Sequence, residues 1–200
     1  MKKQFAVFVA ALVMAGASQA AGDAAAGQTK SVTCLACHGA DGNSVNPIWP
    51  KLAGQHPEYI LKQLADLKSG ARKDPLMSPM AAPLSDADMA DLAAYFSSQK
   101  TAPGTAAPDQ AKAGETLYRA GNAASGLTAC IACHGPSGAG NGAANFPRLA
   151  GQHASYVDKA LKDLRSGARS NDPNRMMRDI AGKMTDAEIA AVAQYIQGLR

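Results

Sequence analysis

All four cysteines of this 200-residue chain lie in two copies of one six-residue motif. The first copy reads CLACHG over residues 34–39, and the second reads CIACHG over residues 130–135. A CxxCH motif is typical of covalent haem attachment, because its two thiols can add to the two vinyl groups of a haem while the adjacent His binds the iron. The motifs therefore predict two covalently bound haem c groups, attached through Cys34, Cys37, Cys130 and Cys133.

Other uses of these cysteines fit the sequence less well. A thioredoxin-like redox pair needs a βαβ setting, whereas the surrounding sequence has helical periodicity and no strands rich in Val or Ile. A zinc site could combine Cys and His, but neither Cys pair has a second pair beside it. A disulfide within each motif would leave its histidine without a role. We therefore expect His38 and His134 to be the first axial ligands of two haem irons.

The sixth iron ligand decides whether a haem is open to chemistry or closed for electron transfer. When the two halves are aligned on their last predicted helix, at an offset of 100 residues, Met77 matches Met177. The other methionines after the N-terminal segment align with Leu or Ile, which cannot replace a ligand, so we interpret them as apolar filler: Met80, Met89, Met176 and Met184. We expect Met77 and Met177 to be the ligands, in an irregular segment that folds over the haem.

Two histidines compete with these methionines. His56 and His153 recur in the two halves as faithfully as the methionine pair, and they would give bis-His coordination with a lower potential. Both lie where a helix is predicted to begin, a position where His can serve as a capping or surface group. We therefore interpret His56 and His153 as hydrogen-bonding residues at helix starts.

The haem motifs belong to a tandem duplication. Three further blocks occur in the same order in both halves: LAGQH at 52–56 and 149–153, LKSGAR at 67–72 with LRSGAR at 164–169, and LSDADMADLAAYF at 84–96 with MTDAEIAAVAQYI at 184–196. Between the halves, KTAPGTAAPDQ is rich in Pro, Ala and Gly, as linkers are. The expected organisation is an N-terminal domain at 21–99, a linker at 100–110 and a C-terminal domain at 111–200.

The first residues have the pattern of a secretion signal. The basic residues Lys2 and Lys3 precede a mostly apolar run over 5–17, and residues 18–20 read SQA, a small-x-small cleavage site. A membrane anchor is the alternative, but the run is shorter than the ~20 apolar residues that span a bilayer. We expect residues 1–20 to be cleaved and the mature chain to be exported to the periplasm, an oxidising compartment.

The expected fold class is all-α, with the same helices in each half. Asp23 and Asp109 are good N-cap residues for a first helix. The second helix should end at Gly70 in one half and Gly167 in the other, with apolar residues on one face: Ile60, Leu64 and Leu67, and then Val157, Leu161 and Leu164. Capping boxes open the last helices: Ser85 with Asp88, and Thr185 with Glu188. Each half is marginal in size for a core of side chains alone, so we expect the haem to fill its centre.

These motifs resemble the cytochrome c4 family, the periplasmic di-haem cytochromes c of bacteria. The resemblance covers the whole mature sequence and rests on both CxxCH motifs, the LAGQH and SGAR blocks, and the helix endings AYF and QYI. It implies two tandem class I cytochrome c domains, each wrapped around one covalent haem. It also implies specific contacts: Gly27 and Gly114 crossing Tyr95 and Tyr195, the carbonyls of Pro50 and Pro147 orienting the proximal imidazoles, and Trp49 and Phe146 packing near the haems.

The resemblance implies an electron carrier rather than an enzyme. Single electrons would pass from an upstream respiratory donor to a membrane-bound terminal oxidase. Two alternatives are the di-haem cytochrome subunit of a flavocytochrome c sulfide dehydrogenase and a di-haem peroxidase, although the matched methionines count against a peroxidase. The sequence leaves peripheral association with the membrane open, and nothing in the composition suggests nucleic-acid binding.

Charge is distributed unevenly between the halves. Residues 21–103 carry 7 Lys and Arg against 8 Asp and Glu, a net charge of −1, while residues 104–200 carry 11 against 8, a net charge of +3. A difference of this kind can orient a carrier on its partners.

Overall fold

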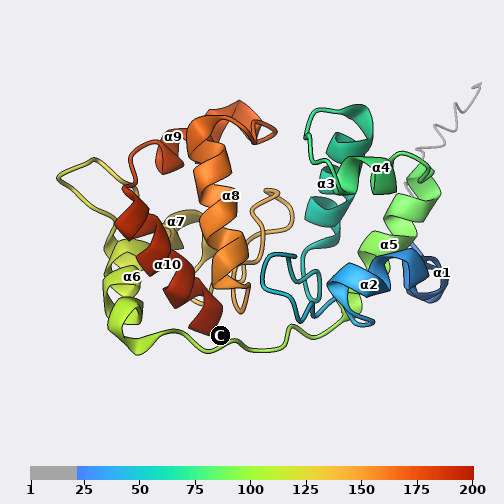
Figure 1. The fold of residues 1–200 in the computed structure, drawn as a ribbon, viewed down its shortest axis with the longest axis horizontal. Helices are drawn as coiled ribbons and strands as arrows, with labels where there is room; N and C mark the ends of the chain where they lie inside the picture. The colour runs from blue at the N-terminus through green and yellow to red at the C-terminus, as the bar shows by residue number, and fades with distance from the viewer. Residues whose placement is uncertain (1–21) are drawn as a thin grey trace, which may run out of the picture.

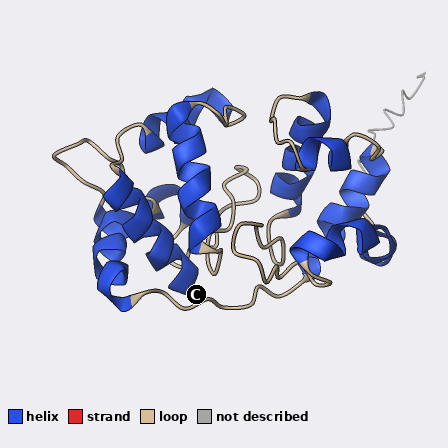
Figure 2. Ribbon diagram, viewed as in Figure 1, coloured by secondary structure: helices blue, strands red, loops and turns tan. Residues whose placement is uncertain are grey.

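The computed structural model describes residues 22–200, so the predicted signal peptide lies outside the described residues. The described chain forms two helical halves that lie side by side and are joined by one extended segment (Figure 1). Figure 2 shows helices and loops only, and two isolated β-bridges in the C-terminal half are the sole extended pairings of residues 22–200. The prediction of an all-α fold is confirmed. In this part of the chain no helix has the length and apolar character needed to cross a membrane.

The two halves contain matching α-helices in the same order, and each half adds one 3₁₀ turn at a different place. The N-terminal half consists of α1 (Ala24–Lys30), a 3₁₀ turn η1 (Ser31–Cys34), α2 (Leu35–His38), α3 (Pro57–Ser69), α4 (Met77–Ala81) and α5 (Asp86–Ser98). The C-terminal half consists of α6 (Pro108–Ala120), α7 (Ile131–His134), α8 (Ala154–Ser166), a 3₁₀ turn η2 (Pro173–Arg175), α9 (Met176–Ala181) and α10 (Asp186–Gly198). The duplication in the sequence is therefore a duplication of structure.

The first helices begin differently in the two halves. In α1 the Asp23 carboxylate accepts the main-chain N–H groups of Ala25 and Ala26, so the predicted N-cap is confirmed. The matching prediction for Asp109 is wrong, because α6 begins at Pro108 and its N-cap is Ala107. Proline suits the first helical position, where its missing N–H needs no partner. Asp109 instead lies in the first turn, where a carboxylate interacts favourably with the helix dipole.

The predicted limits of the other long helices are confirmed. Helices α3 and α8 end at Gly70 and Gly167, whose φ angles of 81° and 80° are left-handed. Both α5 and α10 open with the predicted capping box, with both of its hydrogen bonds formed. These signals are local in the chain, so they do not depend on contacts between the halves.

First and last helices cross at a glycine in each half. A Cβ atom on Gly27 would lie 2.0 Å from the Asp91 carbonyl oxygen, and one on Gly114 would lie 2.1 Å from that of Ala191. The same Cβ atoms would lie 2.8 Å from the Cβ atoms of Tyr95 and Tyr195. Only glycine lets these backbones approach so closely. The crossing that the family resemblance implied is confirmed.

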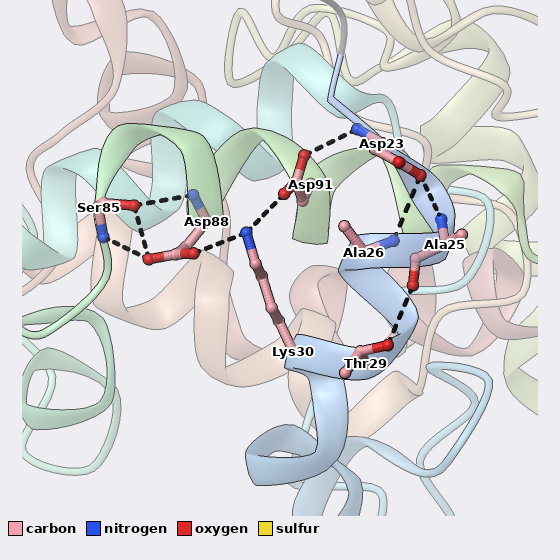
Figure 3. Close-up of polar contacts among 8 residues, drawn as sticks. All are labelled: Asp23, Ala25, Ala26, Thr29, Lys30, Ser85, Asp88 and Asp91. Atoms are coloured by element: carbon pink, nitrogen blue, oxygen red, sulfur yellow. Dashed lines mark hydrogen bonds and ion pairs between the residues drawn. The ribbon is translucent and has the colours of Figure 1, made fainter.

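An ion-pair network also joins α1 to α5 (Figure 3). The Lys30 ammonium lies 2.7 Å from an Asp88 carboxylate oxygen and 2.6 Å from one of Asp91. Asp91 in turn accepts the main-chain N–H of Asp23 at 2.7 Å. At the position that matches Lys30, counted from the crossing glycines, the C-terminal half has Leu117, which packs against the apolar core. The contact beside the helix crossing is therefore ionic in the N-terminal half and apolar in the C-terminal half.

Candidate haem sites

Each CxxCH motif is coiled into a single helical turn. Residues three and four apart share a face of a helix, so one turn presents both thiols and the imidazole on the same side. The turns α2 and α7 end at His38 and His134, and the next residues, Gly39 and Gly135, have φ angles of 78° and 75° that break the helix. The sequence CxxCHG is thereby a self-contained structural unit.

The two proximal histidines are buried and oriented in the same way. His38 and His134 are each 5% exposed, and the Nδ1 atom of each lies 2.9 Å from a proline carbonyl oxygen, that of Pro50 or Pro147. Since a carbonyl only accepts, Nδ1 carries the proton and the Nε2 lone pair is left for a metal. Burial lowers the pKa of both imidazoles, against the opposing effect of the proline carbonyls. The carbonyl contacts that the resemblance implied are confirmed.

No disulfide joins the two cysteines of either motif. Burial raises the pKa of the Cys34 thiol, and it raises that of Cys130 to about 11. Cys34 packs against the apolar core of its half, which contains Ile60 and Phe96, and Cys130 packs against the core that contains Tyr118. Two thiols, a neutral imidazole and an apolar wall match the donor set and surroundings that a covalently attached haem requires.

Met77 and Met177 occupy equivalent places in the two halves. Ala81 and Ala181 are both 0% exposed, and their carbonyls accept the N–H groups of Leu84 and Met184 in the same turn. This correspondence reproduces the offset of 100 residues from the sequence, and hence the pairing of the two methionines. Their ligation of iron stays a prediction.

The prediction that these methionines lie in irregular segments is wrong. Met77 is the first residue of α4, and Met177 is the second residue of α9. Aspartates upstream of both short helices accept N–H groups of the first turn: the Asp74 carboxylate accepts the N–H of Met77 at 2.9 Å, and that of Asp172 accepts the N–H of Arg178 at 3.0 Å. Each methionine is therefore held on an ordered turn.

His56 and His153 bond across the two halves. Each occupies the N-cap position of its helix, α3 or α8, and its side chain is hydrogen-bonded, so the prediction of a hydrogen-bonding residue at a helix start is confirmed, although neither side chain caps its own helix. The Nε2 atom of His56 lies 2.8 Å from the carbonyl oxygen of Ala139, and that of His153 lies 2.8 Å from the carbonyl oxygen of Ser44. Because this interface engages a ring nitrogen of each histidine, the structure favours the methionines as candidate sixth ligands.

The residues just after the proximal prolines also face the other half. Lys51 is 8% exposed, and its ammonium donates to the carbonyls of Ala102, at 2.7 Å, and Gly151, at 2.9 Å. Burial lowers the pKa of this lysine. Since Pro50 holds the His38 imidazole, the loop that orients one proximal ligand is anchored on the opposite half.

Sequence reasoning missed the hydrogen bonds by which one tyrosine in each half fixes the loop after the haem motif. Tyr95 on α5 donates to the carbonyl of Ala40 at 2.7 Å, whereas Tyr118 on α6 donates to that of Gly135 at 2.7 Å. A tyrosine hydroxyl therefore does the same task in both halves, but it comes from the last helix in one half and from the first helix in the other. Alignment of the repeats could not reveal that Tyr95 and Tyr118 are equivalent in this role. Phe146 lies near His134, with ring centroids 6.3 Å apart, as expected for a residue beside the haem.

Comparison with known proteins agrees with this architecture. A family model described as Cytochrome c matches residues 21–100 and again residues 111–200. Cytochrome c4 of Thiocapsa roseopersicina is 56% identical over 180 residues, which cover 89% of this chain and 93% of that protein. The crystal structure of reduced recombinant cytochrome c4 from Pseudomonas stutzeri has a TM-score of 0.88 and 51% identity, and the match covers 90% of this chain and all of that one.

A third relative has a different name. The thiosulfate dehydrogenase electron acceptor of Thiomonas intermedia (strain K12) is 43% identical over 178 residues, covering 86% of this chain and 81% of that protein.

The two matching domains and the paired proximal sites define a di-haem cytochrome c. Within that class, the chain belongs to the cytochrome c4 family. It is an electron carrier with two covalently bound haem c groups, one in each half.

Proposed function

We propose that this chain carries single electrons in the periplasm from a respiratory donor to a membrane-bound terminal oxidase. One haem is attached through Cys34 and Cys37 and ligated by His38 and Met77. The other is attached through Cys130 and Cys133 and ligated by His134 and Met177. Each haem supplies one iron that cycles between the ferrous and ferric states.

The observation that carries this proposal is the matched pair of buried imidazoles. His38 and His134 share their depth, their Nδ1 partner and their distance to it, so neither site is specialised relative to the other on the proximal side. A thioether opposite each imidazole would close both irons to substrate and leave electron transfer as their chemistry. Export is supported by the pattern of residues 1–20.

An absorption spectrum with haem quantitation tests the haem sites. We expect two haems per chain that survive acid-acetone extraction, and a weak far-red band of ferric haem with a Met ligand. Bound zinc without haem, in protein made with the haem-attachment machinery, would contradict the proposal. A spectrum that lacks the far-red band would move the ligand assignment to His.

The acceptor is tested with membranes. Reduced protein should be oxidised by oxidase-containing membrane vesicles, and cyanide should stop this oxidation. Persistence of the reduced spectrum with active membranes would remove the oxidase from the proposal.

A second candidate donor follows from the relative in Thiomonas. That protein's name assigns it electrons from a thiosulfate dehydrogenase, and it shares 43% of aligned residues with this chain. Rapid reduction of the purified protein by thiosulfate plus such a dehydrogenase would favour this donor. Copurification of a flavoprotein would instead favour the sulfide dehydrogenase alternative.

A further inference from the structure

The segment that leads to Met177 is longer than the one that leads to Met77, although the proximal sides of the two sites match. In both halves an Asp-Pro pair precedes the methionine. Met77 lies two positions after Pro75, whereas Met177 lies four positions after Pro173. The C-terminal half therefore has two additional residues at this place, 174–175, directly before α9.

Both additional residues have left-handed backbone conformations. Asn174 has φ 52° and ψ 28°, and Arg175 has φ 60° and ψ 13°. Asparagine tolerates this region comparatively well, but a residue with a long side chain such as arginine does not. Among residues 22–99, by contrast, only glycines have φ angles in this region. Backbone strain is therefore present beside Met177 and absent beside Met77.

A buried aspartate fixes this strained turn. The Asp172 side chain is 7% exposed, and its carboxylate accepts two hydrogen bonds from Arg178, one from the main-chain N–H at 3.0 Å and one from Nε at 2.7 Å. These bonds close a loop over residues 173–177, which contains both left-handed residues and Met177. A strained conformation persists only where its surroundings determine it. The pair of Asp172 and Arg178 supplies that constraint.

The N-terminal segment is held in a different way. The Asp74 carboxylate accepts the N–H group of Met77 itself at 2.9 Å, so the constraint acts directly on the candidate ligand. Pro79 and Pro83 follow, and neither of the equivalent positions in the C-terminal half is a proline. Proline limits the number of conformations that a released segment can adopt. The segment around Met77 therefore has less strain to relieve and less freedom to gain when it detaches.

We propose that Met177 exchanges with an external nitrogen-donor ligand more readily than Met77 does, which makes the C-terminal half the one that binds small ligands at its iron. This inference rests on the proposed ligation by methionine. Release of Met177 lets residues 174–175 return to ordinary backbone angles, so relief of strain offsets part of the cost of breaking the iron–sulfur bond.

Imidazole titration of the ferric holoprotein tests this inference, with the weak far-red band of Met-ligated haem as the readout. Neutral imidazole donates a nitrogen lone pair in place of the thioether lone pair, so the exchange transfers no electron and no proton. The parent should lose the band in two steps of equal amplitude, and imidazole should bind about tenfold more tightly in the first step, which belongs to the C-terminal half.

Variants assign the two steps to the two segments. Arg175→Gly should weaken imidazole binding in the first step by about threefold, because glycine adopts left-handed angles without strain. The matched control is Arg175→Ala, which keeps the strain and loses only an exposed ion pair with Asp179; this variant should move neither step. Asp172→Asn weakens the bond to Arg178 and should tighten the first step alone by about threefold. Its counterpart Asp74→Asn should move the second step alone.

The outcomes separate this inference from the proposed function. Loss of the whole band in a single step, a band that survives saturating imidazole, or equal effects of Arg175→Gly and Arg175→Ala would overturn the inference and leave the methionine ligation intact. A shift of the second step in Asp172→Asn would overturn it as well. A parent that lacks the far-red band would contradict the proposed ligation instead. Titration of the parent needs no variant, so it decides the question even where a substitution prevents folding.

Discussion

Gln55 and Gln152 form equivalent pairs of hydrogen bonds with the opposite half of the molecule. Gln55 donates to the Arg148 carbonyl at 2.9 Å and accepts the Arg148 N–H at 2.8 Å. Gln152 donates to the Lys51 carbonyl and accepts the Lys51 N–H, both at 2.9 Å. The two glutamines are counterparts in the LAGQH repeats, so the interface is a pseudo-twofold contact between like surfaces.

Replacing either glutamine should loosen the contact between the halves. Gln55→Ala and Gln152→Ala each remove three hydrogen bonds, two of them to the opposite half, and leave an N–H and a C=O of that half unpaired, at a cost of ~1–3 kcal/mol for each group left unpaired. Urea unfolding measures the loss. The control is Gln28→Ala, at an exposed position of α1, which should change the free energy of unfolding by less than ~0.5 kcal/mol. Equal stability of parent and interface variants would show that these bonds do not hold the halves together.

The haem should be part of the core of each half. In Cys37→Ala or Cys133→Ala we expect one half to be poorly folded, because a domain of this size is marginal without its cofactor. Far-UV circular dichroism and haem quantitation report helicity and haem together. A variant that kept full helicity and melted like the parent would contradict this prediction.

Acid should weaken the crossing of α1 and α5. The Lys30 ammonium is the main reason that the pKa values of Asp88 and Asp91 lie below the ordinary aspartate range, with further contributions from Ser85 and Asp23. A folded-state pKa below the unfolded value means that these pairs stabilise the protein above the unfolded pKa, and that this stabilisation is lost as pH falls through the folded value.

The measurement compares pH profiles. Between pH 6 and pH 3, where unfolded Asp titrates at about 3.9, the free energy of unfolding should fall less in Lys30→Met than in the parent. The control is Lys112→Met, which removes an exposed lysine of α6 that forms no ion pair with the described residues. If Lys30→Met lost stability with acid as steeply as the parent, the ion pairs would not be the acid-sensitive element.

The two irons should have the same ligands and unequal potentials. Thioether donates weakly and favours ferrous iron, so Met77→His and Met177→His should each lower one step of a redox titration, by roughly 0.1 V or more. The C-terminal half carries +3 against −1, which resists the added charge of ferric iron, and its haem should have the higher potential by an amount that salt reduces. Met177→His should therefore lower the upper step. A fall of the lower step would refute the charge argument, and unchanged steps would refute the ligand assignment.

Local sequence signals predicted most of the fold. The capping boxes at Ser85 and Thr185 and the glycines that end α3 and α8 act within one helical turn, so spacing alone located them. Two errors have local causes: α6 begins at Pro108, one residue before Asp109, and the Asp74 carboxylate binds the N–H of Met77 at the start of an ordered turn. The CxxCH motif also lies within one helical turn, so the sequence alone predicted the proximal side of each haem site.

The features that the sequence did not predict depend on contacts between residues about one hundred positions apart. The sequence predicts a hydrogen-bonding role for His56 at a helix start, but it does not predict the partner, because Ala139 belongs to the other half. The same holds for Arg169 and Tyr59, which no periodicity connects. Repetition of LAGQH and SGAR indicated that these residues mattered, but the docking of the two halves assigns their partners.

The Lys51 ammonium links three parts of the chain. Lys51 belongs to the N-terminal half, and its ammonium donates hydrogen bonds to the carbonyls of Gly151 in the C-terminal half and of Ala102 in the connecting segment. The segment keeps each half at a high effective concentration for the other, so an interface of polar contacts suffices to close the molecule. Cleavage near Ala102 would turn that closure into an ordinary bimolecular association. The halves of a dilute sample would then separate, and the distance between the two haems would depend on protein concentration.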